Sequence, residues 1–77
     1  MDRKLKVYNF IKEFWFLVKS WIDVPSQSDS EGWEAILTDS EKLKPYYSED
    51  TAEGRFFRKM VVDWMEYLKE RSKEGER

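Results

Sequence analysis

The chain has 77 residues, of which 40% are hydrophobic and 39% charged, and its formal net charge is -2. This length allows one small domain, residues 1–77, and no apolar run approaches the roughly 18 to 20 residues that a membrane-spanning helix needs. The absence of Cys and His excludes disulfides, thiol catalysis and Cys-based zinc sites, and it removes the usual general base and the commonest metal ligand.

The first predicted helix covers residues 3–22. Its main apolar row recurs at steps of three and four and consists of Val7, Phe10, Phe14, Leu17 and Trp21. A second row lies beside it and consists of Ile11, Val18 and Ile22, with Trp15 at its edge. Together the rows cover about half of the helix circumference, and we expect both to serve the core. Pro25 keeps Val24 out of the helical conformation, so the helix ends near Asp23.

The second predicted helix covers residues 29–44. Ser28 and Glu31 have the spacing of a capping box, and acidic residues near the start suit the positive end of the helix dipole. A narrow apolar stripe follows, formed by Trp33, Ile36, Leu37, Ser40 and Leu43. Lysines occupy the last turn, and Pro45 is expected to end the helix.

The third predicted helix covers residues 52–71. Asp50 or Thr51 is placed to cap its start, whereas Gly54 weakens the first turn by about 1 kcal/mol relative to Ala. Its apolar face consists of Phe57, Met60, Val61, Trp64, Met65 and Leu68, flanked by Phe56 and Tyr67. From about residue 72 onward the chain has no apolar side chain, and we expect this tail to fray.

Three amphipathic helices with short connections predict an all-α fold, an antiparallel three-helix bundle. So small a core predicts modest stability, or a dimer that buries additional area. Charged residues interrupt the first apolar segment, which argues against a signal peptide, and the lack of Cys favours a cytoplasmic location.

Carboxylates are the only plausible catalytic or metal-binding groups. Asp63, Glu66 and Glu70 share one face of the third helix, where they could bind a hard cation. Lys59 and Lys69 lie on or beside the same face, however, and such alternation of sign is typical of a solvated helix surface. The sequence therefore predicts no enzyme activity, no metal, no cofactor and no small-molecule substrate.

Charge is distributed unevenly along the chain. Residues 1–20 carry five basic and two acidic groups, residues 21–53 two basic and nine acidic, and residues 54–77 seven basic and five acidic. Intramolecular complementarity and solubility explain this pattern most simply. The alternative is an acidic decoy that binds a basic, nucleic-acid-binding surface of a host protein through Asp29, Glu31, Glu34, Asp39, Glu41, Glu49 and Asp50. Direct DNA binding is disfavoured, because a helix-turn-helix needs a basic recognition helix and the middle helix is acidic.

The first helix has more apolar side chains than its core row requires. Leu5 and Phe16 lie opposite the main apolar row, and Tyr8 and Trp15 lie at its border. With two lysines they predict an aromatic-basic strip of Leu5, Tyr8, Lys12, Trp15, Phe16 and Lys19. Exposed aromatic clusters are typical of contact sites, although the third helix or the loops could instead cover these side chains. Membrane-surface binding is disfavoured, because the other helix face is also apolar.

The strip predicts a non-enzymatic protein-binding module that acts with a protein partner or as a homodimer. Several local patterns also resemble small uncharacterised helical proteins of Firmicutes prophages and conjugative elements. These patterns are the aromatic spacing of Phe10, Phe14, Trp15 and Trp21, the segment 28–33, the pair Tyr46-Tyr47, and the ending at residues 64–73. The resemblance covers most of the chain, but Lys44-Pro45-Tyr46-Tyr47 replaces a lysine-rich approach to a single tyrosine. It implies an all-helical fold and a mobile-element origin, and no catalytic residues.

Overall fold

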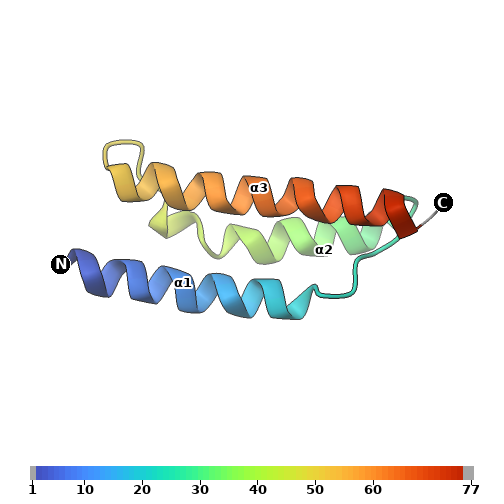
Figure 1. Ribbon diagram of the computed structural model, residues 1–77, viewed down its shortest axis with the longest axis horizontal. Coiled ribbons are helices and arrows are strands. Elements are labelled where there is room, and N and C mark those ends of the chain that lie inside the picture. Colours follow the sequence, from blue (N-terminus) through green and yellow to red (C-terminus); the bar gives the residue numbers. More distant parts are fainter. Residues whose placement is uncertain (1, 76–77) are drawn as a thin grey trace.

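The computed structural model describes residues 2–75, which form an all-α three-helix bundle, as predicted. The elements are α1 (Arg3–Ser20), α2 (Ser30–Glu41), the short 3-10 helix η1 (Lys44–Tyr46) and α3 (Ala52–Gly75). Figure 1 shows that α1 and α3 run in the same direction and that α2 runs antiparallel to both. The bundle is elongated, with principal extents of 45 × 19 × 17 Å.

Helix α1 ends two residues earlier than predicted. The Asp2 carboxylate caps its start by accepting a hydrogen bond from the backbone N–H of Lys4 at 3.2 Å. At the other end, Trp21 leaves the helical conformation, and its indole N–H donates to the Asp39 carboxylate of α2 at 3.0 Å. A tertiary hydrogen bond, and not Pro25 alone, therefore accompanies the end of α1.

Helix α2 is shorter than predicted and begins with a different cap. The Asp29 carboxylate, not the Ser28 hydroxyl, accepts the capping hydrogen bond, which comes from the backbone N–H of Gly32 at 3.0 Å. The helix ends at Glu41. Pro45 lies inside η1 instead of terminating α2, because the first turn of a helix does not need the N–H that proline lacks.

Helix α3 extends four residues past its predicted end. Of the two candidate caps, Thr51 is the one used, since its hydroxyl accepts from the backbone N–H of Gly54 at 3.0 Å. The Ser72 hydroxyl is buried and donates to the carbonyl of Pro25 at 2.8 Å, and the Arg71 guanidinium donates to the carbonyl of Ile22 at 2.7 Å. Residues 72–75, the start of the tail that we expected to fray, therefore continue α3. Residues 76 and 77 lie outside the described part of the chain.

The core follows the main apolar row of α1. Its buried hydrophobic residues are Phe10, Leu17, Ile36, Leu43, Phe57, Val61, Trp64 and Leu68. Phe10 is fully buried, and its ring stacks on the ring of Phe57 with a centroid separation of 4.1 Å. The prediction that Ile11, Ile22 and Leu37 belong to the core is wrong, because all three are exposed. Two neighbouring helices cover a narrower arc of α1 than its apolar rows occupy.

The 3-10 helix η1 closes one end of the core with an aromatic ring. The ring of Tyr46 makes edge contacts with Phe10 and Phe57, at centroid separations of 5.6 and 6.3 Å. A hydrogen bond with the Glu13 carboxylate, followed by desolvation, raises the pKa of Tyr46. Burial raises the pKa of Tyr47, and the charge of Arg58 partly opposes that rise. Both phenols are therefore neutral near pH 7.

Candidate protein-binding surface on α1

All six side chains of the predicted aromatic-basic strip are exposed. Leu5 is 50% exposed, Tyr8 60%, Trp15 56% and Phe16 55%. Lys12 and Lys19 are exposed as well. The alternative in which α3 or the loops cover these residues is therefore wrong.

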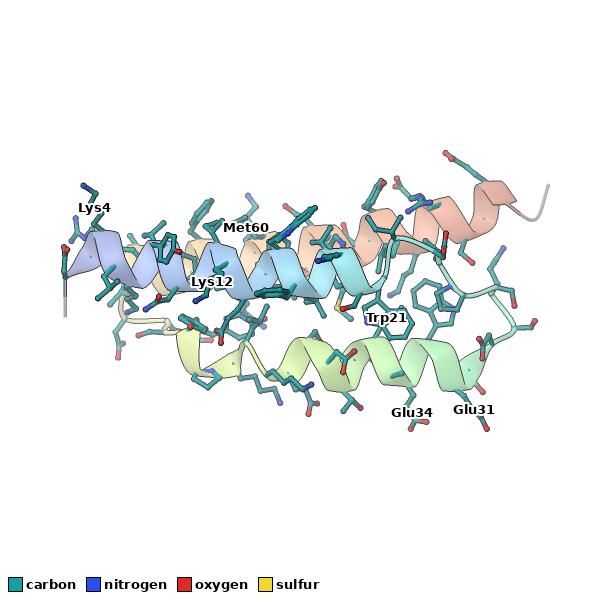
Figure 2. All side chains as sticks on the ribbon, turned by 90° about the horizontal axis from the view of Figure 1, so that it is seen from below. Lys4, Lys12, Trp21, Glu31, Glu34 and Met60 are labelled. Atoms are coloured by element: carbon teal, nitrogen blue, oxygen red, sulfur yellow. The ribbon has the colours of Figure 1, made fainter. Side chains whose placement is uncertain are left out.

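The two lysines of the strip lie over its aromatic rings. The ammonium nitrogen of Lys12 is 5.8 Å from the ring centroid of Tyr8, and that of Lys19 is 5.9 Å from the ring centroid of Phe16. These distances allow cation–π attraction between side chains three or four residues apart on one helix. Figure 2, which views the bundle from the α1 side, shows Lys12 on the outer surface of α1. The lysines therefore bias the conformations of two exposed rings.

The strip has two edges that border different helices. At about 100° per residue, Tyr8 and Trp15 lie on the α3 side of the two lysines, whereas Leu5 and Phe16 lie on the α2 side. Phe16 helps to line a shallow groove between α1 and α2, together with Glu13, Ser20, Asp39 and Lys42. The strip is therefore a broad outer face of α1 with lysines along its middle.

Sequence reasoning missed several exposed apolar residues that extend this surface. They are Ile11 of α1, Ile22 just after the end of α1, and Phe56 and Tyr67 of α3. A signal for the α1 residues was present. Tyr8, Ile11, Trp15, Val18 and Ile22 follow one another at steps of three and four, as regularly as the core row does. Most of this row is left exposed, although Val18 is partly buried against the core.

The acidic residues of the alternative hypothesis do not form one patch. Asp29 caps α2, Asp39 accepts from Trp21 and lies 3.6 Å from the Lys42 ammonium, and Glu41 lies 3.6 Å from that of Lys44. The loop that carries Glu49 and Asp50 lies at the end of the bundle opposite to the start of α2 (Figure 1).

The two remaining acids, Glu31 and Glu34, are exposed on α2. Both project from the outer side of α2, away from α1 (Figure 2). Glu31 and Glu34 are the only acidic side chains of α2 that take no part in a helix cap or in an ion pair among the described residues.

Among residues 2–75, no group of three or more His, Cys, Asp or Glu side chains is arranged to hold a metal ion. Within the same residues, no helix combines the length and apolarity of a membrane span.

Comparison of the chain with protein-family models, with curated proteins and with solved structures finds no match. The fold class is thus defined by the structure alone, as an all-α three-helix bundle. Function has to be derived from the surface of α1 and its surroundings, because fold class does not specify function.

Proposed function

We propose that the chain is a non-enzymatic protein-binding module that contacts its partner through the exposed aromatic side chains of α1, chiefly Trp15 and Phe16. One observation carries this proposal. Four large apolar side chains of α1 are at least half exposed, although the same helix buries a separate apolar row. Monomeric proteins rarely leave extended apolar patches open to water unless they serve for contact.

The composition of the surface suits protein recognition. Tryptophan and other aromatic residues dominate binding energy at interfaces, because they bury large areas and lose little conformational entropy. The two lysines add charge that the partner has to match. The resemblance to proteins of prophages and conjugative elements supports a mobile-element origin, and the lack of Cys favours a cytoplasmic setting.

The proposal predicts that Trp15→Glu abolishes partner binding while the fold is retained. The tagged chain, Trp15→Glu and Phe16→Glu are each used to capture proteins from a host lysate to which the untagged wild-type chain has been added, and captured proteins, the untagged chain included, are quantified by mass spectrometry. We expect at least tenfold less of the specific partner with either variant, because a charge in a desolvated interface is costly. Circular dichroism checks that each variant keeps its helices.

Val62→Glu is the matched control for this experiment. Val62 is an exposed apolar residue of α3 outside the aromatic strip, so it receives the same added charge elsewhere on the bundle. Equal capture by the wild-type chain and all three variants would contradict the proposal. So would loss of the fold in Phe16→Glu, because that residue would then belong to the core.

The same experiment separates the proposal from the acidic decoy. Binding through acidic side chains weakens steeply as salt rises, since it depends on screened charge. Binding through the aromatic strip should persist at high salt. Capture that disappears at high salt, survives Trp15→Glu and is lost in Glu31→Lys with Glu34→Lys would favour the decoy instead.

A further inference from the structure

We propose that the partner is a second copy of this chain, and that the interface is a two-helix face which extends the α1 surface onto α3. This inference rests on the proposed function and names its partner. Of the two chief contacts it keeps Trp15 alone, because Phe16 lies on the α2 side of the lysines and outside this face. Trp15→Glu, and not Phe16→Glu, is therefore expected to weaken self-association. The α1–α3 face lies on the side of the bundle away from α2, and it consists of Tyr8, Ile11, Trp15, Ile22, Phe56 and Tyr67.

Contacts between α1 and α3 place these residues on one face. The helices are parallel, with Arg3 bound to Glu53 at 2.8 Å, Phe10 stacked on Phe57, and the carbonyl of Ile22 bound to Arg71. These contacts fix the register of the two helices, that is, which residue of α3 lies beside a given residue of α1 along their line of contact. By the same register, Tyr8 is level with Phe56.

The α3 side of the face starts at a residue that already contacts α1. Glu53, Phe56, Met60, Asp63 and Tyr67 follow one another at steps of three and four and so share one row of α3. Arg71 lies at the C-terminal end of this row. Its guanidinium is 5.7 Å from the ring centroid of Tyr67, and it also donates a hydrogen bond to the carbonyl of Ile22. Figure 2 shows Met60 beside α1, on the edge away from α2. The exposed apolar residues of the two helices therefore line the same seam.

The accessible area of the chain is large for its mass. It is 5839 Å², whereas a folded monomer of 9.4 kDa is expected to expose about 5,000 Å². The excess reflects the elongated shape of the bundle. It is of the order of the roughly 800 Å² that each partner buries in an interface of standard size. Burial of about that area along the α1–α3 face would lower the exposed area of each chain to the value expected for its mass.

Charges on the two borders of the face select the orientation of the second copy. Lys12 and Lys19 lie seven residues apart along the α1 border, and Asp63 and Glu70 lie seven residues apart along the α3 border. None of these four residues belongs to an ion pair within residues 2–75. The three α1–α3 contacts join residues 47 to 50 apart in sequence, whereas each acid follows one lysine by 51 residues. Each acid therefore lies about one to four residues, or about 1.5 to 6 Å, from the level of that lysine.

A two-fold axis parallel to the helices brings α1 of one copy against α3 of the other. It keeps every residue at the same height along the long axis of the bundle. Each Lys12 then faces Asp63 of the second copy, and each Lys19 faces Glu70 of the second copy. A two-fold axis across the helices would instead bring lysine against lysine. The charges therefore favour a parallel, isologous dimer with an apolar centre and complementary borders.

Sedimentation equilibrium of the purified full chain, from about 10 μM to about 1 mM, tests this inference. We expect the wild-type chain and the Val62→Glu control to dimerise. Tyr67→Glu should weaken the dimer at least tenfold, because it places a charge at the apolar centre. The pair Lys12→Glu with Lys19→Glu should also weaken it at least tenfold. Adding Asp63→Lys and Glu70→Lys to that pair should restore the dimer, because every border contact is again between opposite charges.

A wild-type chain that remains monomeric at about 1 mM would overturn the inference. So would a dimer that neither Tyr67→Glu nor the lysine pair weakens, or one that the fourfold charge exchange fails to restore. The failure of this inference is distinguishable from failure of the proposed function. A monomeric chain that still captures another protein in a Trp15-dependent manner would leave the proposed function standing and exclude only the second copy as partner.

Discussion

Phe10→Ala is expected to lower the free energy of unfolding by about 3 to 5 kcal/mol. Phe10 is fully buried where α1 meets η1 and α3. Its ring stacks on Phe57 and contacts the rings of Phe14 and Tyr46, so its removal leaves a cavity among packed aromatic rings. A domain of this size has only about 5 to 15 kcal/mol of stability, and the variant should therefore be largely unfolded or close to it. Urea denaturation followed by circular dichroism measures the loss.

Phe16→Ala is the matched control, since it removes the same side chain from the same helix. Phe16 is exposed on the opposite side of α1, and we expect its removal to change the free energy of unfolding by no more than about 0.5 kcal/mol. Similar losses for the two variants would contradict the assignment of one phenylalanine to the core and the other to the surface.

Gly54→Ala is expected to destabilise the chain by about 1 to 3 kcal/mol. Helix propensity alone predicts the opposite sign, a gain of about 1 kcal/mol. A Cβ atom at Gly54 would, however, collide with the backbone nitrogen, carbonyl carbon and oxygen of Ser48. The loop before α3 would have to move, because backbone atoms cannot rotate out of the way as a side chain does.

Gly75→Ala provides the comparison for Gly54, because it lies in the same helix and a Cβ atom there would meet no other atom within 4 Å. We expect it to be neutral or slightly stabilising. Thermal denaturation of both variants beside the wild type tests the close approach of the loop. A stabilising effect of Gly54→Ala would show that Ser48 does not pack against this turn.

Most of the fold could be predicted from periodicity, because the steps of three and four that define the core row of α1 do not depend on tertiary context. The ends of the helices could not. The end of α1 is accompanied by the hydrogen bond from Trp21 to Asp39, and the last turns of α3 by the bond from Ser72 to Pro25. Both bonds join residues far apart in the sequence, and local propensity gives no information about such partners.

The candidate surface was predictable in part for the same reason. Helical spacing places Trp15 and Phe16 away from the core row, and both are exposed. Spacing does not tell on which side of α1 the third helix packs, because an antiparallel three-helix bundle can turn in either hand. The residues of α3 that lie level with Trp15 therefore become apparent only from the register of the two helices. Periodicity wrongly places Ile11 in the core, because its row has the same period as the buried one.

The central claim is that α1 carries two apolar rows, one for the core and one for a partner. The most direct measurement is the urea-dependent unfolding of Trp15→Glu, at a concentration low enough to keep both it and the wild-type chain monomeric. We predict a free energy of unfolding within about 0.5 kcal/mol of the wild-type value, because Trp15 is 56% exposed and is not one of the buried core residues. A loss of about 3 kcal/mol or more would place Trp15 inside the fold and contradict the account.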